Sequence, residues 1–289
     1  MMAHRGVLED HDAGLTDTRP GRQHWNVNTV DWAAIRCDLL SGAPDILFYL
    51  VAASSFLEAT TEHYTANLVV QFRGDDEITS WLERSWLPEE LQHGRVLRRY
   101  VEAVWRDFPW DGVYDAFLTE FAAHCCSEEL EPTRCREMAS RCVVEMGTAG
   151  YYTMLSRLSP EPVLAAVARH IAEDEIRHYK HFLRYFHRYR QTERTGRLAV
   201  GKALSNRLRM IANQDSAIAM KHLYHARHPG EPFNRRVYQR LRHSSRQLIS
   251  PHFPYRMCVE MLLAPLGLPP RARRIAVPIA AMLARRLVP

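Results

Sequence analysis

The sequence predicts an all-α protein built around four long helices, on three observations. Apolar residues recur at helical spacing along almost the whole chain, and no sustained alternating runs indicate strands. Breaks at residues 108–112 and 159–162 leave long segments of about 27–33 residues, or roughly 40–50 Å of helix each. A chain of 289 residues with 46% hydrophobic and 25% charged residues is also typical of a globular protein.

Local signals set the bounds of the predicted helices. Asn28 and Thr29 favour a cap on a short helix, Gly74 ends the first long helix, and Ser159, followed by proline, caps the last one. We therefore expect helices over residues 29–40, 45–73, 75–107, 113–127, 132–158 and 160–190.

The chain is expected to divide into three parts. Residues 1–28 are polar, as in a flexible tail, residues 29–191 form a four-helix bundle, and residues 192–289 form a basic helical extension packed on it. The final stretch, Ile275–Leu287, is amphipathic. We interpret it as a core helix, with contact to a membrane surface as the alternative.

Charge is distributed unevenly along the chain. From residue 181 onward there are 21 Lys and Arg against 4 Asp and Glu, although the whole chain carries only +5. One interpretation is a solvated basic surface. The other is a docking surface for an acidic carrier protein, a phosphorylated cofactor or an anionic membrane. No nucleic-acid motif accompanies the charge, so a nucleic-acid partner is not expected.

The composition favours a cytoplasmic location. The longest apolar run, Ile46–Leu57, is too short to span a bilayer, and the amino terminus does not resemble a signal peptide. The six cysteines show no CxxC pairing and fit free thiols in a reducing compartment.

Two Glu-x-x-His pairs carry the strongest chemical signal. Glu90/His93 and Glu175/His178 each lie on one helix face, because residues three apart are neighbours on a helix. Chance alone would give about one such pair in this composition. The two pairs, however, fall near the middle of the second and fourth long helices, where the helices of an antiparallel bundle meet at one height.

The other two long helices each supply a glutamate near their middle, Glu58 and Glu145. Four carboxylates and two imidazoles would then converge, which is the ligand set of di-iron and di-manganese bundles. Oxygen-rich ligation with one imidazole per ion suits iron or manganese better than zinc. Glu62, one turn beyond Glu58, is the alternative ligand in the first helix. The plainer interpretation is that these are surface charges and satisfied core histidines.

Several neighbours of these residues are candidates for supporting roles. Glu89 and Asp174 directly precede ligand glutamates, and each is expected to orient the histidine of the opposite helix. Thr148, one turn from Glu145, offers a hydroxyl for proton delivery.

Nearby small and aromatic residues leave alternatives open. Gly147 and Gly150 serve either close helix packing or room for dioxygen and substrate, and Tyr152 either fills the core or lines an access path. The histidines without a matching carboxylate are interpreted as ordinary residues: His63, His124, His170, His181 and His187.

With these residues in place, the chain resembles the ferritin-like di-iron superfamily and, within it, the acyl-[acyl-carrier-protein] desaturases. The stretch 80–94 is similar to their tryptophan-containing Glu-Glu-x-x-His-Gly pattern, and 171–178 to their Asp-Glu-x-Arg-His helix, at an interval of 85 residues. The resemblance covers roughly residues 45–190. It departs from the family at Gln92, where arginine is usual, in its shorter length, and in the basic region after residue 191.

The resemblance implies a ferritin-like bundle with two iron ions held by Glu58, Glu90, His93, Glu145, Glu175 and His178, with Thr148 near the oxygen site. It also implies O2-dependent desaturation or hydroxylation of an acyl chain, bound to an acyl-carrier protein or free. An external electron donor, ferredoxin-like or chemical, is needed because no flavin, nicotinamide or iron–sulfur motif is present. We expect a homodimer.

Three other functions are compatible with the same ligands or fold. They are N-oxygenation or hydroxylation of a small biosynthetic substrate, non-enzymatic iron binding, and a purely structural bundle.

Overall fold

The computed structural model describes residues 25–125, 130–211 and 215–287 of this chain. It is all-α: no strand occurs in these ranges, which confirms the predicted class. The helices are α1 (Ile46–Ala59), α2 (Thr61–Gln71), α3 (Asp76–Trp81), α4 (Leu87–Val104), α5 (Trp110–Cys125), α6 (Arg134–Leu158), α7 (Pro162–Glu193), α8 (Arg197–Ile211), α9 (Asp215–Arg227), α10 (Arg235–Ile249), α11 (Tyr255–Leu263) and α12 (Pro270–Leu287).

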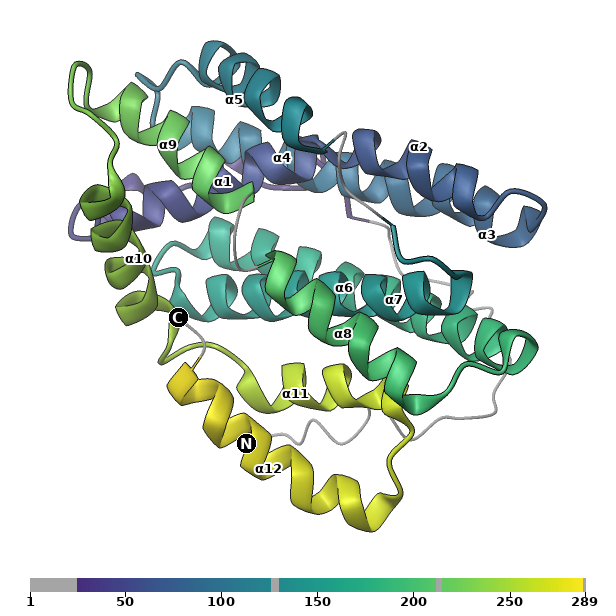
Figure 1. The fold of residues 1–289 in the computed structure, drawn as a ribbon. Helices are drawn as coiled ribbons and strands as arrows, with labels where there is room; N and C mark the ends of the chain where they lie inside the picture. Colours follow the sequence, from purple (N-terminus) through teal and green to yellow (C-terminus); the bar gives the residue numbers. More distant parts are fainter. Residues whose placement is uncertain (1–24, 126–129, 212–214, 288–289) are drawn as a thin grey trace.

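The helices form layers (Figure 1). α1 packs on α4, α6 packs on α7, and the two pairs meet where α4 contacts α7. α5 and α9 cover the α1–α4 pair, whereas α8 and α11 cover α6. α12 packs on α11 at the edge of the molecule.

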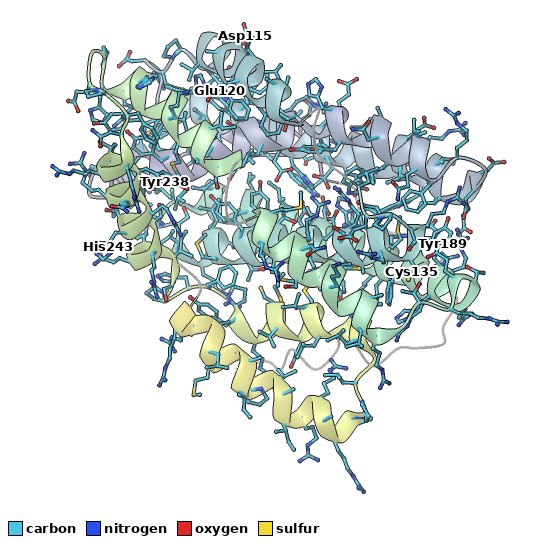
Figure 2. The ribbon with its side chains drawn as sticks, in the orientation of Figure 1. Asp115, Glu120, Cys135, Tyr189, Tyr238 and His243 are labelled. Atoms are coloured by element: carbon cyan, nitrogen blue, oxygen red, sulfur yellow. The ribbon has the colours of Figure 1, made fainter. Side chains whose placement is uncertain are left out.

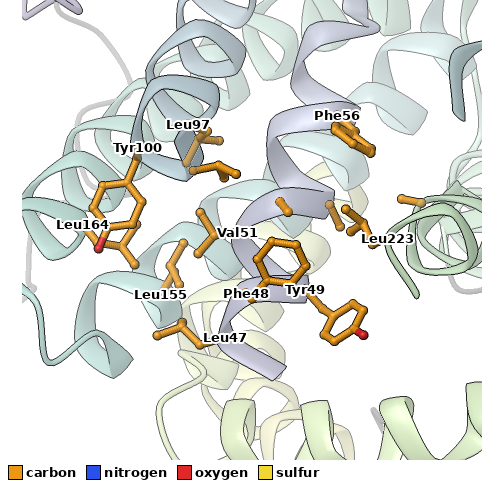
Figure 3. Packing of buried hydrophobic residues seen from close by; sticks show 14 of the residues in the cluster. Leu47, Phe48, Tyr49, Val51, Phe56, Leu97, Tyr100, Leu155, Leu164 and Leu223 are labelled. Carbon is orange, nitrogen blue, oxygen red and sulfur yellow. The ribbon is translucent and has the colours of Figure 1, made fainter. Parts of the chain in front are cut away.

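Two apolar cores lie toward opposite ends of α6 and α7. One contains Phe48 and Phe56 of α1 with residues of α4, α6, α7 and α9 (Figure 3). The other contains Trp86, Met138 and Phe182 and lies toward the far ends of α6 and α7. α6 and α7 pass from one core to the other, whereas α1 and α4 contribute to the first core and their neighbours along the chain, α2 and η3 (Leu82–Trp86), contribute to the second. The buried glutamates and histidines lie near that transition. The cores therefore hold a polar layer between them.

The carboxy-terminal helices contribute to both cores. Val200 and Leu204 of α8 pack in the second core, and Ile218 and Leu223 of α9 pack in the first. The basic extension is thus integrated with the bundle. α12 differs, because Ile275 and several other large apolar side chains on it are exposed, so the prediction that it is a core helix is wrong.

The predicted helices differ from the observed ones in three places. The predicted first long helix is broken at Thr60, whose hydroxyl donates to the Leu57 carbonyl at 2.6 Å in place of a continuing helical bond. Residues 29–40 form two 3₁₀ turns, η1 (Trp32–Ala34) and η2 (Cys37–Leu40), with Asp31 as the cap. The cap of α7 is Glu161, whose side chain accepts from two backbone N–H groups, and not Ser159.

The second long helix contains a π-helical turn, η3 (Leu82–Trp86), directly before the metal-ligand candidates. There the Leu87 N–H donates to the Leu82 carbonyl, five residues back. Pro88 follows and has no N–H to continue the regular ladder. The wider turn thus accommodates the proline, and such turns often occur at functional sites.

Gly94 sets the close approach of α1 and α4. A Cβ atom at this position would lie 2.9 Å from the Ala59 nitrogen and 3.2 Å from the Glu58 carbonyl carbon, both backbone atoms. Neither atom can move without shifting α1. The absence of a side chain at residue 94 is therefore required for Glu58 to reach its observed position.

We expect Gly94→Ala to destabilise the protein by about 1–3 kcal/mol, the usual cost of overpacking. Gly112→Ala in α5 is the control, because a Cβ there meets nothing within 4 Å. The control should be neutral or stabilising by up to about 1 kcal/mol, since alanine is the better helix former. Urea unfolding of the two variants provides the test. Equal stabilities would show that the α1–α4 contact is not tight.

Candidate metal centre

The structure brings together all six side chains that the sequence singles out. Glu58 comes from α1, Glu90 and His93 from α4, Glu145 from α6, and Glu175 and His178 from α7. All are buried, with exposed fractions between 0% and 7%. Such a set of ionisable groups is costly to bury unless a compensating charge joins it.

The six side chains form two overlapping groups, each able to hold a metal ion. One group is Glu58, Glu90, His93 and Glu175, and the other is Glu90, Glu145, Glu175 and His178, with the offered atoms of each group within 4.8 Å of one another. Glu90 and Glu175 belong to both groups. Two ions would therefore share two carboxylates, and each would have its own glutamate and histidine.

The histidine nitrogens that face the cluster are both Nδ1. His93 Nδ1 lies 3.2 Å from Glu175 Oε1 and 4.0 Å from Glu58 Oε2. His178 Nδ1 lies 3.0 Å from Glu90 Oε1 and 3.6 Å from Glu145 Oε2. Each ring thus lies closest to one of the two shared glutamates, His93 to Glu175 and His178 to Glu90.

The other ring nitrogens are held by carboxylates of the opposite helix, as predicted. His93 Nε2 is 3.2 Å from Asp174 Oδ2, and His178 Nε2 is 2.8 Å from Glu89 Oε2. Arg177 ties the two carboxylates together, with an ion pair to Asp174 and a bond of 2.9 Å to Glu89. Carboxylates in this position fix the orientation of metal-binding histidines and increase their basicity.

Several buried atoms of the cluster have no hydrogen bond within the described part of the chain. They are His93 Nδ1, His178 Nδ1, Glu145 Oε2 and Glu175 Oε1. Buried polar atoms are nearly always satisfied, so each exception calls for an explanation. All four point into the cluster, and a bound cation would satisfy every one of them. The donor set therefore fits a metal centre.

The electrostatics also indicate a missing positive charge. Burial raises the pKa of Glu58 well above its usual range, and the nearby carboxylates of Glu90 and Glu175 add to the shift. Burial likewise raises the pKa of Glu145. Burial opposes the charged form of His93 and His178, but their contacts with the surrounding carboxylates raise both pKa values well above the usual range. Protons and a bound cation would therefore compete for these groups.

A cavity of about 540 Å³ connects the cluster with α10. The four glutamates line its inner end, and neither His93 nor His178 does. Its walls are mostly apolar and include Leu50, Leu57, Met220, Leu241, Ile249 and Phe253. Apolar cavities of this volume with a few convergent polar groups are typical of small-molecule sites.

One face of α10 forms the outer wall of the cavity. Its lining residues, spaced as on one helix face, are Tyr238, Leu241, Arg242, Ser245, Arg246 and Ile249. Tyr238 is labelled on this helix in Figure 2. Arg242 and Arg246, one turn apart, form no ion pair with any residue that the structure describes. They bring positive charge to the α10 side of the cavity, whose lining also includes the buried Arg141 and Arg207.

Thr148 and the two glycines lie where α6 passes the cluster. Thr148 Oγ1 donates to Glu175 Oε2 at 2.7 Å and lines the cavity. A Cβ on Gly147 would meet nothing within 4 Å, so this glycine leaves room beside the cavity. A Cβ on Gly150 would lie 2.5 Å from Cys258 Sγ, so this one allows α11 to pack. The two glycines therefore serve different purposes.

Tyr152 is buried, and its hydroxyl donates to Glu58 Oε1 while the residue also lines the cavity. Glu62, the alternative to Glu58, is exposed and lies outside both groups. None of the histidines at 63, 170, 181 and 187 belongs to either group. The side chain of His124 lies outside the described residues, as does most of the predicted tail.

Trp25 is the main residue that the sequence analysis missed. Assigned to the tail, it instead donates from Nε1 to Asp174 Oδ2 at 2.7 Å and stacks on His93, with ring centroids 6.0 Å apart. Gln92, which departs from the desaturase pattern, donates to the Trp25 carbonyl at 2.9 Å and fixes this segment. A tryptophan isolated in a polar stretch was the only signal available.

Comparison of the chain with protein-family models and with curated proteins gives no match.

We expect Glu58→Ala to weaken Mn²⁺ or Fe²⁺ binding by at least about tenfold. Removing a residue that only orients a metal ligand already causes a loss of this size, and Glu58 is itself a candidate ligand. Glu62→Ala is the matched control, one turn away and exposed, and should leave binding unchanged. Anaerobic titration followed by metal analysis of the desalted protein measures both. The reverse order would mean that Glu62 of α2, and not Glu58 of α1, is the ligand.

Metal uptake should release protons, because the pKa values of the two histidines and Glu58 are raised, so that protons compete with the ion for these groups. Apparent affinity should therefore rise with pH, as fewer protons compete with the ion. Calorimetric titration with Mn²⁺ in two buffers of different ionisation enthalpy measures the released protons. A binding heat independent of the buffer would contradict this electrostatic description.

Proposed function

We propose that this protein is an O2-dependent di-iron oxidoreductase of the ferritin-like type. The observation that supports it best is the pair of overlapping groups that share Glu90 and Glu175. Four carboxylates balance the charge of two divalent ions, and one histidine per ion leaves a ligand field rich in oxygen. Such a field suits iron, or alternatively manganese, more than zinc. The similarity of residues 80–94 and 171–178 to desaturase sequences supports the same proposal.

The favoured reaction is desaturation or hydroxylation of an acyl chain. When bound, the two ferrous ions would supply electrons for dioxygen reduction, and an external donor would restore them. For desaturation, dioxygen, two electrons, two protons and two substrate hydrogens yield two waters and a double bond. Thr148, which donates to Glu175 and lines the cavity, would pass protons to the reaction site.

The lining of the cavity favours an apolar substrate with an anionic end. The apolar walls would exclude water from the chain, and Arg242 and Arg246 would attract a carboxylate or phosphate. A free fatty acid or an acyl group on an acidic carrier protein satisfies these requirements. A small polar amine, the substrate of the N-oxygenase alternative, would leave most of this apolar wall without a partner.

The proposal predicts that protein loaded anaerobically with Fe²⁺ binds two iron ions per chain and consumes oxygen in the presence of a reductant. Glu90→Ala and Glu175→Ala should each reduce the content of both ions, because each carboxylate belongs to both groups. Helical circular dichroism should remain. Iron analysis and an oxygen electrode provide the measurements. A stoichiometry of zero or one, or a preference for zinc, would overturn the di-iron proposal.

Charge reversal on α10 tests the substrate. Arg242→Glu should raise KM for an anionic acyl substrate with little change in kcat, because the arginine binds the end of the substrate that does not react. Arg236→Glu, exposed on the same helix but absent from the cavity lining, is the control. If the two variants raise KM equally and only for carrier-bound substrate, the charge steers a protein partner. If neither affects KM, the anionic end is not bound at α10.

A further inference from the structure

The exposed side of α12 carries an apolar stripe. Ile275, Ile279, Met282 and Leu283 have exposed fractions of 66%, 51%, 52% and 45%. Their spacing of four, three and one residues places them on one helix face. Figure 1 shows α12 at the edge of the molecule, and Figure 2 shows side chains extending from it away from α11.

The amphipathicity of α12 is the reverse of that of an ordinary surface helix. The side that packs toward α11 carries small residues, with Val277 only 3% exposed and Ala276, Ala280 and Ala284 half-buried. The larger apolar residues point outward. A helix that only covers a core places its large apolar residues inward. The outward stripe thus requires an apolar partner.

Charge shows what kind of partner fits. Arginines at 271, 273, 274, 285 and 286 lie near the two ends of α12, the helix has no acidic residue, and none of these arginines forms an ion pair with a residue in the described ranges. A second copy packed by a two-fold axis would place arginines against arginines, which is repulsive. An anionic surface would attract the four that are exposed, Arg271, Arg274, Arg285 and Arg286.

The amino-acid composition of α12 favours a lipid surface over an acidic protein as its partner. α12 consists of proline, arginine, alanine, isoleucine, valine, methionine and leucine alone. It therefore offers no aromatic side chain and no uncharged hydrogen-bonding side chain, which protein interfaces ordinarily use for specificity. A membrane surface needs only apolar area and positive charge. No helix among the described residues has the length and hydropathy to cross a bilayer, so this helix would lie along it.

We propose that α12 docks the protein on anionic membranes, with the apolar stripe inserted at the headgroup boundary and the arginines bound to lipid phosphates. Arg246, which lines the cavity, donates to the Arg286 carbonyl at 2.9 Å, so the docked helix is joined directly to the cavity wall. The docking itself does not depend on the metal centre or on the proposed reaction.

Vesicle flotation with the full chain tests the proposal. The protein should float with vesicles of equimolar phosphatidylcholine and phosphatidylglycerol and remain unbound with phosphatidylcholine alone. The double variant Ile279→Ser/Met282→Ser should lose at least about tenfold in partitioning, since two apolar side chains no longer insert. Arg274→Glu/Arg285→Glu should lose at least as much on anionic vesicles, because each arginine near the surface contributes several-fold.

The control is Val70→Ser in α2, which alters an exposed apolar side chain (60% exposed) away from α12. It should bind vesicles like the unaltered protein, and all variants should keep the same melting temperature and metal content. Unchanged flotation of the Ile279→Ser/Met282→Ser variant would overturn the proposal. So would light scattering showing a concentration-dependent dimer that this variant abolishes, because a second copy would then cover the stripe. Binding to an acidic carrier protein but not to anionic vesicles would also overturn it.

Discussion

Burial of six ionisable side chains between two apolar cores is the constraint on which the rest of the structure depends. Uncompensated charge at this depth would cost more than the surrounding packing can offset. The raised pKa values of Glu58, His93 and His178 show that this environment favours their protonated forms. With two divalent cations in place of these protons, the same side chains have their ordinary charges and their unpaired atoms acquire partners. The stability of the fold and its affinity for metal therefore depend on the same six side chains.

The features around this layer hold it in place. Gly94 brings α1 close to α4, the π-helical turn accommodates Pro88 ahead of Glu90, and Arg177 joins the two carboxylates behind the histidines. Trp25, far from these residues in the sequence, packs on His93 and donates to Asp174, and so covers the cluster on the side of the histidines. On the opposite side Gly147 leaves space, and the cavity begins there. The cluster is therefore covered by Trp25 on the side of the histidines and open to the cavity on the side of the glutamates.

Sequence reasoning predicted the parts of the structure that repeat or recur at fixed spacing. Helical periodicity gave the all-α class, and two Glu-x-x-His pairs at mid-helix predicted which side chains meet. The break at Thr60 was missed because it leaves the apolar pattern intact. Trp25 was missed because its contact with Asp174 spans 149 positions, and no local signal reports a contact of that kind. The outward face of α12 was missed because periodicity identifies an apolar stripe but not which side of the helix the protein covers.

The cavity reaches the cluster from the side of the four glutamates, and neither histidine lines it. A chain lying in this space presents one edge to the metal positions and the other to the wall formed by α10. The two hydrogens of any methylene group held there are consequently not equivalent, because one points toward the carboxylates and the other away. The side from which the four glutamates face the cavity would therefore let this site distinguish the two prochiral hydrogens of a bound methylene group.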